Sequence, residues 1–194
     1  MSSLALPRWI AHLRRLAEPA AVSAAPLGAG ALDVPFRGAV CGEPVEAPAE
    51  PIGTGELGLW WARFDERVDV DEILAAPTDG SLLPQGLFRT IEVWTDAELS
   101  ALHALWWLAR DRQRDDWRRR LADARDWHLL NTQPDNATNR PWALHVFLLG
   151  GTGECIHYAE TLLHNCLTMT GRPDPLSAWI LLDAARALEE EASG

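Results

Sequence analysis

Helix start and stop signals follow one another from Thr95 to the C-terminus, and they constrain the fold more than any other feature of this sequence. The segment Thr95-Asp96-Ala97-Glu98 matches a capping box, in which a threonine hydroxyl and a glutamate carboxylate bind backbone N–H groups at a helix start. The helix predicted from there to about Arg110 is apolar nearly all round, so we expect it to be central in the fold.

Further helices are predicted after it, separated by short turns. Residues 111–130 carry a narrow apolar stripe among aspartates and arginines, formed by Trp117, Leu121, Ala124 and His128. Helix caps then predict a helix over 141–149, another over 153–170 that Gly171 ends, and a last one from Asp174-Pro175 onward. Short turns favour antiparallel neighbours, so the predicted fold class is mainly α: an antiparallel helical bundle or helical-hairpin array of about five helices.

The N-terminal part of the chain has a different composition. Residues 4–17 place apolar side chains at helical spacing, which predicts an amphipathic helix that docks either on the body or on a partner. Prolines recur over 19–58 too often for a helix or a central strand, which predicts an irregular arm rich in Pro, Ala and Gly. The predicted organisation is an amphipathic helix and extended arm over 1–58, followed by a helical domain over 59–194.

Two stretches near this boundary have the composition of strands. Residues 57–64 and 87–94 are rich in aromatic and branched apolar residues, and each is short enough for a strand. We therefore expect a small β-hairpin beside the helical body.

The charged residues exclude several classes of function. All 17 basic residues are arginine, so the lysine-free chain has neither a Schiff-base lysine for pyridoxal phosphate nor a GK[ST] phosphate loop. The formal net charge of −11 makes the protein acidic and argues against binding to nucleic acid. No apolar run has the length of a membrane span.

The three cysteines, Cys41, Cys155 and Cys166, form no CxxC pair. On one helix, Cys155 and Cys166 would lie about 16 Å apart, too far for a disulfide. Reduced thiols are typical of the cytoplasm, which is the predicted location. Both residues fall on the apolar side of their helix, where burial raises the pKa of a thiol and makes it a poor nucleophile.

The segment from Trp127 to Trp142 concentrates amides, hydroxyls, an acid, a histidine and an arginine between two tryptophans. Such a segment suits a polar ligand, and its candidate ligand-binding residues are Trp127, His128, Asn131, Asp135, Asn136, Arg140 and Trp142. The alternative explanation is turn chemistry, because the same residue types form turns and cap neighbouring helices. His128 also lies on an apolar stripe, where a lone histidine is most often a core residue.

A second candidate site lies on the helix predicted over 153–170. His157, Glu160 and His164 share its polar face, and imidazole and carboxylate groups are ordinary ligands of zinc or iron. Their spacing matches neither HExxH nor paired ExxH motifs. The alternative is that this polar face simply contacts water.

Two functions follow from these features. The absence of a catalytic motif, the acidic charge and the N-terminal arm favour a helical protein-interaction or scaffold module that has no catalytic activity or cofactor and binds a protein partner. The alternative is a small enzyme or ligand-binding protein, with or without zinc or iron, whose site joins the 127–145 segment to the 153–170 helix. In that alternative, Asp135 or Glu160 acts as acid or base. A histidine shares the proton transfer or holds a metal, and the candidates are His128, His145, His157 and His164. The sequence leaves the substrate, the partner and the oligomeric state open.

Overall fold

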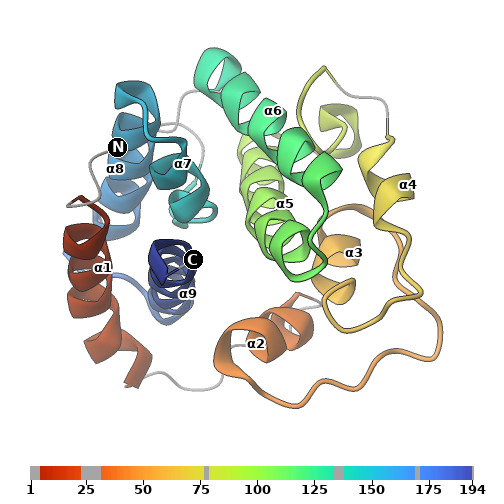
Figure 1. Ribbon diagram of the computed structural model, residues 1–194, viewed down its shortest axis with the longest axis horizontal. Coiled ribbons are helices and arrows are strands. Elements are labelled where there is room, and N and C mark those ends of the chain that lie inside the picture. The colour runs from red at the N-terminus through yellow and green to blue at the C-terminus, as the bar shows by residue number, and fades with distance from the viewer. Residues whose placement is uncertain (1–4, 23–31, 77–78, 133–137, 169–170, 194) are drawn as a thin grey trace. The chain divides into compact units, whose positions relative to one another are not determined.

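The protein is mainly helical (Figure 1). The computed structural model describes most of the chain, namely residues 5–22, 32–76, 79–132, 138–168 and 171–193. These ranges contain nine α-helices and one short 3-10 helix, and they contain no strand. Backbone contacts divide the chain into two compact units, residues 28–133 and residues 1–27 with 134–194.

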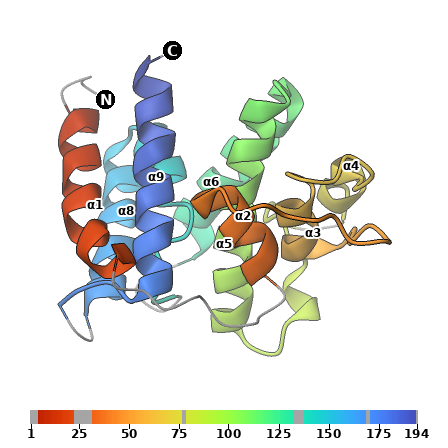
Figure 2. The same ribbon diagram turned by 90° about the horizontal axis from the view of Figure 1, so that it is seen from below.

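The unit made of the two chain ends contains four helices: α1 (Ala5–Val22), α7 (Leu144–Gly150), α8 (Gly153–Leu167) and α9 (Pro175–Ser193). Helices α1 and α9 lie side by side and antiparallel (Figure 2). Leu13 and Ala17 of α1 are fully buried, and Arg14 binds both carboxylate oxygens of Glu189 at 2.8 and 2.7 Å. The sequence left open whether the N-terminal helix docks on its own chain or on a partner. In the structure, α1 packs on α9 of its own chain.

Local capping signals fix the starts of α8 and α9 as the sequence predicts, whereas α8 ends at Leu167, before the predicted stop at Gly171. The Thr152 hydroxyl accepts the Cys155 N–H at 3.2 Å, and Gly171 adopts a left-handed φ of 69°. The Asp174 carboxylate accepts the N–H groups of Leu176 and Ser177. Helix α7 differs from its prediction at one end, because Ala143 takes a left-handed φ of 53° and delays the helix from Pro141 to Leu144.

The second unit is built on a helical hairpin. Its long helices are α5 (Ile91–Asp111) and α6 (Asp115–Asn131), and its shorter elements are α2 (Asp33–Cys41), α3 (Gly55–Trp61), α4 (Val70–Leu74) and the 3-10 helix η1 (Gln85–Leu87). Helix α5 is buried along most of its length, as the sequence predicts for a central helix. The predicted stripe of α6 is also confirmed, since all four of its residues are buried. Helix α3 packs on α5, where the Trp60 indole N–H donates to the Ser100 hydroxyl at 2.9 Å.

The predicted β-hairpin is wrong. Residues 57–64 lie largely in α3, because a short apolar run suits a buried helix face as well as a strand and only packing distinguishes the two. Residues 87–94 span the end of η1 and the first turn of α5. There the Thr90 hydroxyl accepts the Val93 N–H at 3.4 Å, and this cap outweighs the strand preference of Ile91 and Val93.

The predicted capping box at Thr95 is also wrong. Helix α5 begins four residues earlier, at Ile91. The Thr95 hydroxyl therefore lies inside the helix and donates to the Ile91 carbonyl at 2.9 Å. Glu98, the other half of the expected box, is fully buried and binds a different part of the chain, as described below.

The proline-rich segment is less irregular than its composition indicates. Helix α2 occupies residues 33–41, and Pro35 lies in its first turn, where a proline costs no hydrogen bond. Residues 42–54 have no regular secondary structure. Arg67 holds part of this stretch by donating to the carbonyls of Pro48 and Ala49 while it pairs with Asp65.

A charged cluster joins α4 to α6. Arg114 pairs with Asp71 at 2.9 Å and with Asp116 at 2.6 Å, and the Trp117 indole N–H donates to Asp71 at 2.6 Å. The bonds from Trp117 and Arg114 lower the pKa of Asp71, and Arg114 lowers the pKa of Asp116 to about 2. Both carboxylates thus stay ionised in the folded state under conditions that protonate them in the unfolded chain.

This cluster predicts an acid-dependent contribution to stability. A lowered folded-state pKa stabilises the protein above the ordinary aspartate pKa, and this stabilisation is lost as the pH falls from about 4 towards 2. We expect Arg114→Gln to lower the Tm by about 1–3 °C at pH 6. The difference in Tm between this variant and the native protein should disappear by about pH 2. Thermal melts of both proteins over this pH range measure the difference in Tm, and Arg118→Gln in α6 is the control. A difference in Tm that stays constant with pH would refute the prediction.

Within the described residues, no helix is long and apolar enough to cross a membrane.

Candidate functional site

The residues predicted to bind a ligand fall into both units. Trp127, His128 and Asn131 lie at the C-terminal end of α6, in the unit of residues 28–133. Arg140, Trp142 and His145 belong to the other unit, where Trp142 and His145 are buried. Asp135 and Asn136 lie outside the described residues.

The predicted metal-binding residues lie on α8. His157, Glu160 and His164 are all exposed, and the opposite side of the helix is buried. Thr161 and Thr168, on the same polar face, donate to carbonyls of their own helix. The described part of the chain contains no group of three or more His, Cys, Asp or Glu placed to hold a metal ion, so zinc or iron binding remains a prediction from sequence spacing.

The cysteines of α8 lie on its buried side, as predicted. Cys155 and Cys166 are both buried free thiols. Burial, together with the negative charge of Asp174, raises the pKa of the Cys166 thiol to about 12. Cys166 therefore stays protonated near neutral pH and is unsuited to nucleophilic chemistry.

His128 belongs to a buried polar network between α5 and α6. Its Nε2 atom lies 3.4 Å from Glu98 Oε1, and its Nδ1 atom lies 3.0 Å from the Thr132 hydroxyl. Its ring stacks on Trp94 with centroids 5.9 Å apart. His128 and Glu98 are both fully buried, so they act in the core of this unit.

Glu98 fixes a segment that has no helix or strand, residues 79–83. Its two carboxylate oxygens accept the backbone N–H groups of Leu82 at 2.5 Å and Leu83 at 2.7 Å. A buried carboxylate is costly unless hydrogen bonds satisfy it, and these two amides do so. The carboxylate oxygens of Glu98 thereby replace the strand pairing or helix that would otherwise satisfy these backbone groups.

Two more side chains hold the carbonyls of the same segment. The Trp94 indole N–H donates to the Leu83 carbonyl at 2.9 Å. Arg120 of α6 donates to the Gly80 carbonyl at 2.8 Å and to the Ser81 carbonyl. Residues 79–83, which we call the clamped segment, are therefore bound by side chains of both helices of the hairpin.

The clamped segment forms one wall of an apolar groove with a volume of about 260 Å³. The groove lies between this segment, the loop before α3, helix α4 and the 3-10 helix η1. Its lining residues are Gly53, Thr54, Gly55, Glu72, Ile73, Ala76, Leu82, Leu83, Pro84, Leu87 and Phe88. Of these described residues, Glu72 is the one that carries a charge.

Exposed apolar side chains occur in and after η1, which contributes to one side of this groove. Leu87 of η1 is 79% exposed, and Ile91 and Val93 in the first turn of α5 are 45% and 55% exposed. Ile91 and Val93 lie two residues apart on α5 and so face different sides of the helix, and neither lines the groove. Leu87 is therefore the highly exposed apolar side chain that belongs to the groove. We call the groove together with its exposed residue Leu87 the groove surface.

No protein-family model, curated protein or solved structure matches this chain.

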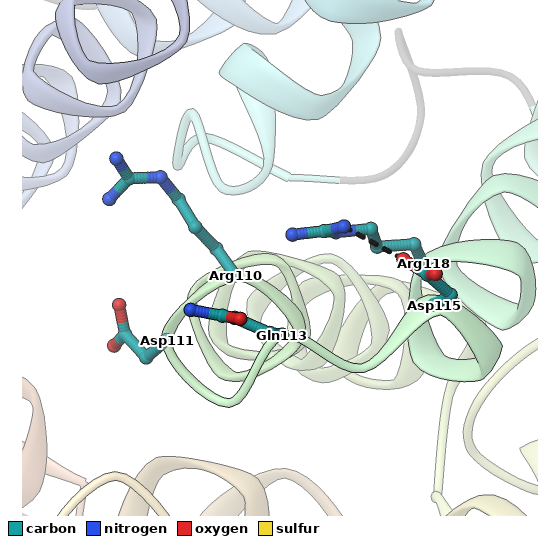
Figure 3. Close-up of a pocket in the computed structure, with 5 residues that line it drawn as sticks. All are labelled: Arg110, Asp111, Gln113, Asp115 and Arg118. Carbon is teal, nitrogen blue, oxygen red and sulfur yellow. Dashed lines mark hydrogen bonds and ion pairs between the residues drawn. The ribbon is translucent and has the colours of Figure 1, made fainter. Parts of the chain in front are cut away.

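A second, more polar pocket lies at the turn between α5 and α6 (Figure 3). It has a volume of about 520 Å³ and is lined by Arg110, Asp111, Gln113, Asp115 and Arg118. Its acids already pair with arginines, because Asp115 binds Arg118 at 2.8 Å and Asp111 binds Arg63 at 3.3 Å. Charges of both signs alternate around it, so the pocket favours neither an anion nor a cation.

Sequence reasoning missed the groove surface. Leu87 and Phe88, which line it, belong to the stretch 87–94 that was predicted to be a strand. Thr90, Ile91, Glu92 and Val93 alternate polar and apolar residues, which is typical of a half-buried strand, so no signal in the sequence indicated a groove. The clamped segment gave no sequence signal, because its partners Glu98 and Arg120 lie 15 to 40 residues away in the chain.

Proposed function

We propose that this protein is a helical protein-interaction module without catalytic activity, and that it binds a partner protein at the groove surface. The observation that carries the proposal is the apolar groove beside Leu87, which exposes 79% of its side chain. Burying such a side chain in an interface is favourable by about 1.5–3 kcal/mol, and exposed apolar patches of this kind commonly mark protein interfaces.

The size and chemistry of the groove support a protein partner over a metabolite. Its volume of about 260 Å³ is below the ~300–1,000 Å³ of most small-molecule sites. It suits an anchoring side chain of another protein better than a whole ligand. Thr54 and Glu72 are the polar residues among the described residues that line it, which is fewer polar groups than a catalytic site that combines an acid, a base and a nucleophile.

A pair of matched variants tests this proposal. Leu87 and Leu130 are both highly exposed leucines of the same unit, at 79% and 86%, but Leu130 lies at the end of α6 and does not line the groove. We expect Leu87→Asp to weaken partner binding at least tenfold, because it places a charge at the apolar interface. Leu130→Asp should leave binding unchanged.

The measurement is affinity enrichment with the three proteins, followed by titration of the enriched partner. Thermal melts of both variants establish that each remains folded. The proposal fails if every enriched protein binds the Leu87→Asp variant as tightly as it binds the native chain.

A further inference from the structure

We infer that the occupant of the groove is a short apolar segment of the partner that also carries a basic side chain, with the apolar residues in the groove and the basic group against Glu72. This inference rests on the proposed function and adds the chemistry of the partner. It follows from the lining of the groove, the position of its charge and the rigidity of its wall.

The apolar lining selects the core of the occupant. Ile73, Leu82 and Leu83 are buried side chains that line the groove, and Leu87 and Phe88 lie closer to solvent. An apolar anchor that enters the groove meets aliphatic and aromatic side chains on several sides and removes them from water. A polar occupant would lose its hydration there without gaining hydrogen bonds.

The charge of the groove selects a cation. Glu72 is exposed in the first turn of α4 and lines the groove. Of its acidic neighbours, Asp71 is bound by Arg114 and Trp117, and Asp69 caps α4 by accepting the Glu72 N–H at 3.0 Å. The Glu72 carboxylate has no ion-pair partner among the described residues, and it offers an acceptor to an arginine or lysine of the partner.

The same charge disfavours two other occupants. A fatty acid would bring its carboxylate against Glu72, and like charges at an interface are repulsive. A second copy of this chain would bring a formal charge of −11 against an equal charge. A basic segment is attracted both by Glu72 and by the net negative charge of the protein.

The wall of the groove is fixed before the partner arrives. Leu82 and Leu83 are held through their N–H groups by Glu98, and Leu83 is also held through its carbonyl by Trp94. A preformed wall reduces the entropy lost on binding, so that a short segment suffices as an occupant. This favours a peptide of a few residues over a large folded surface.

Three synthetic peptides test the inference. They share a leucine-phenylalanine-leucine core and differ in two flanking residues, which are both arginine, both glutamine or both glutamate. By fluorescence anisotropy at low ionic strength, we expect the arginine peptide to bind the native protein about threefold more tightly than the glutamine peptide. The glutamate peptide should bind most weakly.

Two variants with equal charge change locate the effect. Glu72→Gln should remove the preference for arginine, whereas Glu66→Gln, an exposed glutamate in the turn between α3 and α4, should preserve it. If the preference survives in Glu72→Gln, or if all three peptides bind equally, the charge assignment is overturned. The proposed function still stands in that case, provided that Leu87→Asp abolishes binding of the peptides.

The remaining outcomes identify a different occupant. If none of the peptides binds, the short segment is overturned, and partner enrichment with the Leu87 and Leu130 variants decides the proposed function separately. A dimer that sedimentation velocity detects and Leu87→Asp dissociates would make a second copy the occupant. Binding of decanoate more tightly than the arginine peptide would make it a fatty acyl chain.

Discussion

Replacing Glu98 with alanine is expected to destabilise the unit of residues 28–133 by about 3–5 kcal/mol, the largest effect of any single substitution proposed for this protein. The substitution removes the acceptors of two buried N–H groups, those of Leu82 and Leu83. Each unsatisfied buried group costs about 1–3 kcal/mol. The contact of His128 with the carboxylate is lost as well.

The Glu98→Gln variant keeps the size and shape of the side chain but replaces the carboxylate with an uncharged amide. The amide keeps one acceptor but turns an NH₂ group towards a backbone N–H, so we expect a loss of about 1–3 kcal/mol. Glu66→Gln is the control, because Glu66 is exposed in a turn of the same unit and such substitutions usually change stability by less than about 0.5 kcal/mol. Urea unfolding followed by tryptophan fluorescence measures all three. A Glu98→Ala variant within about 1 kcal/mol of the native protein would contradict the structural role assigned to this carboxylate.

Gly80→Ala is expected to cost about 2–5 kcal/mol, from backbone strain and steric overlap together. Gly80 has a φ of 130°, which side chains other than glycine rarely adopt, and an added Cβ would lie 2.4 Å from Trp127 Cδ1. The Trp127 ring cannot easily withdraw, since it packs edge-on against Trp94 at 5.8 Å and against His128 at 5.3 Å. The strain falls on the clamped segment, so we also expect weaker binding at the groove.

Gly86→Ala provides the matched control for this prediction. Gly86 lies in η1 with open space around its position, and it has no left-handed φ. The substitution should change stability by less than about 1 kcal/mol, because it meets no atoms and restricts the unfolded chain. Equal stability of the two alanine variants in urea unfolding would refute the close packing of Trp127 against Gly80.

The two largest predictions concern one feature, the clamped segment, and this links stability to the proposed function. Leu82 and Leu83 line the groove, and the side chains that hold them come from α5 and α6. Loss of Glu98 therefore removes the hydrogen bonds that hold Leu82 and Leu83 in the groove wall, although Glu98 itself does not line the groove. A Glu98→Gln variant that folds at low temperature should bind the arginine peptide more weakly than the native protein does.

The sequence by itself determined the helices whose ends are capped locally. Thr152 and Asp174 each accept N–H groups two or three residues away and thereby fix the starts of α8 and α9. The buried stripe of α6 was also predictable, because a period of 3.6 residues is a property of one helix. These features depend on neighbours within one or two turns, and such neighbours are visible in the sequence.

Only the tertiary structure decided the start of α5, the helical state of residues 55–61 and the groove surface. Thr90 and Thr95 both precede acidic residues, and the structure uses Thr90 as the cap, while Glu98 binds the amides of Leu82 and Leu83 instead of a helix start. The apolar run of α3 became a helix because α5 offers it a face to pack on. The physical reason is the same in each case: the free energy comes from partners that are distant in the chain, and no local pattern records which partner a buried polar or apolar group will find.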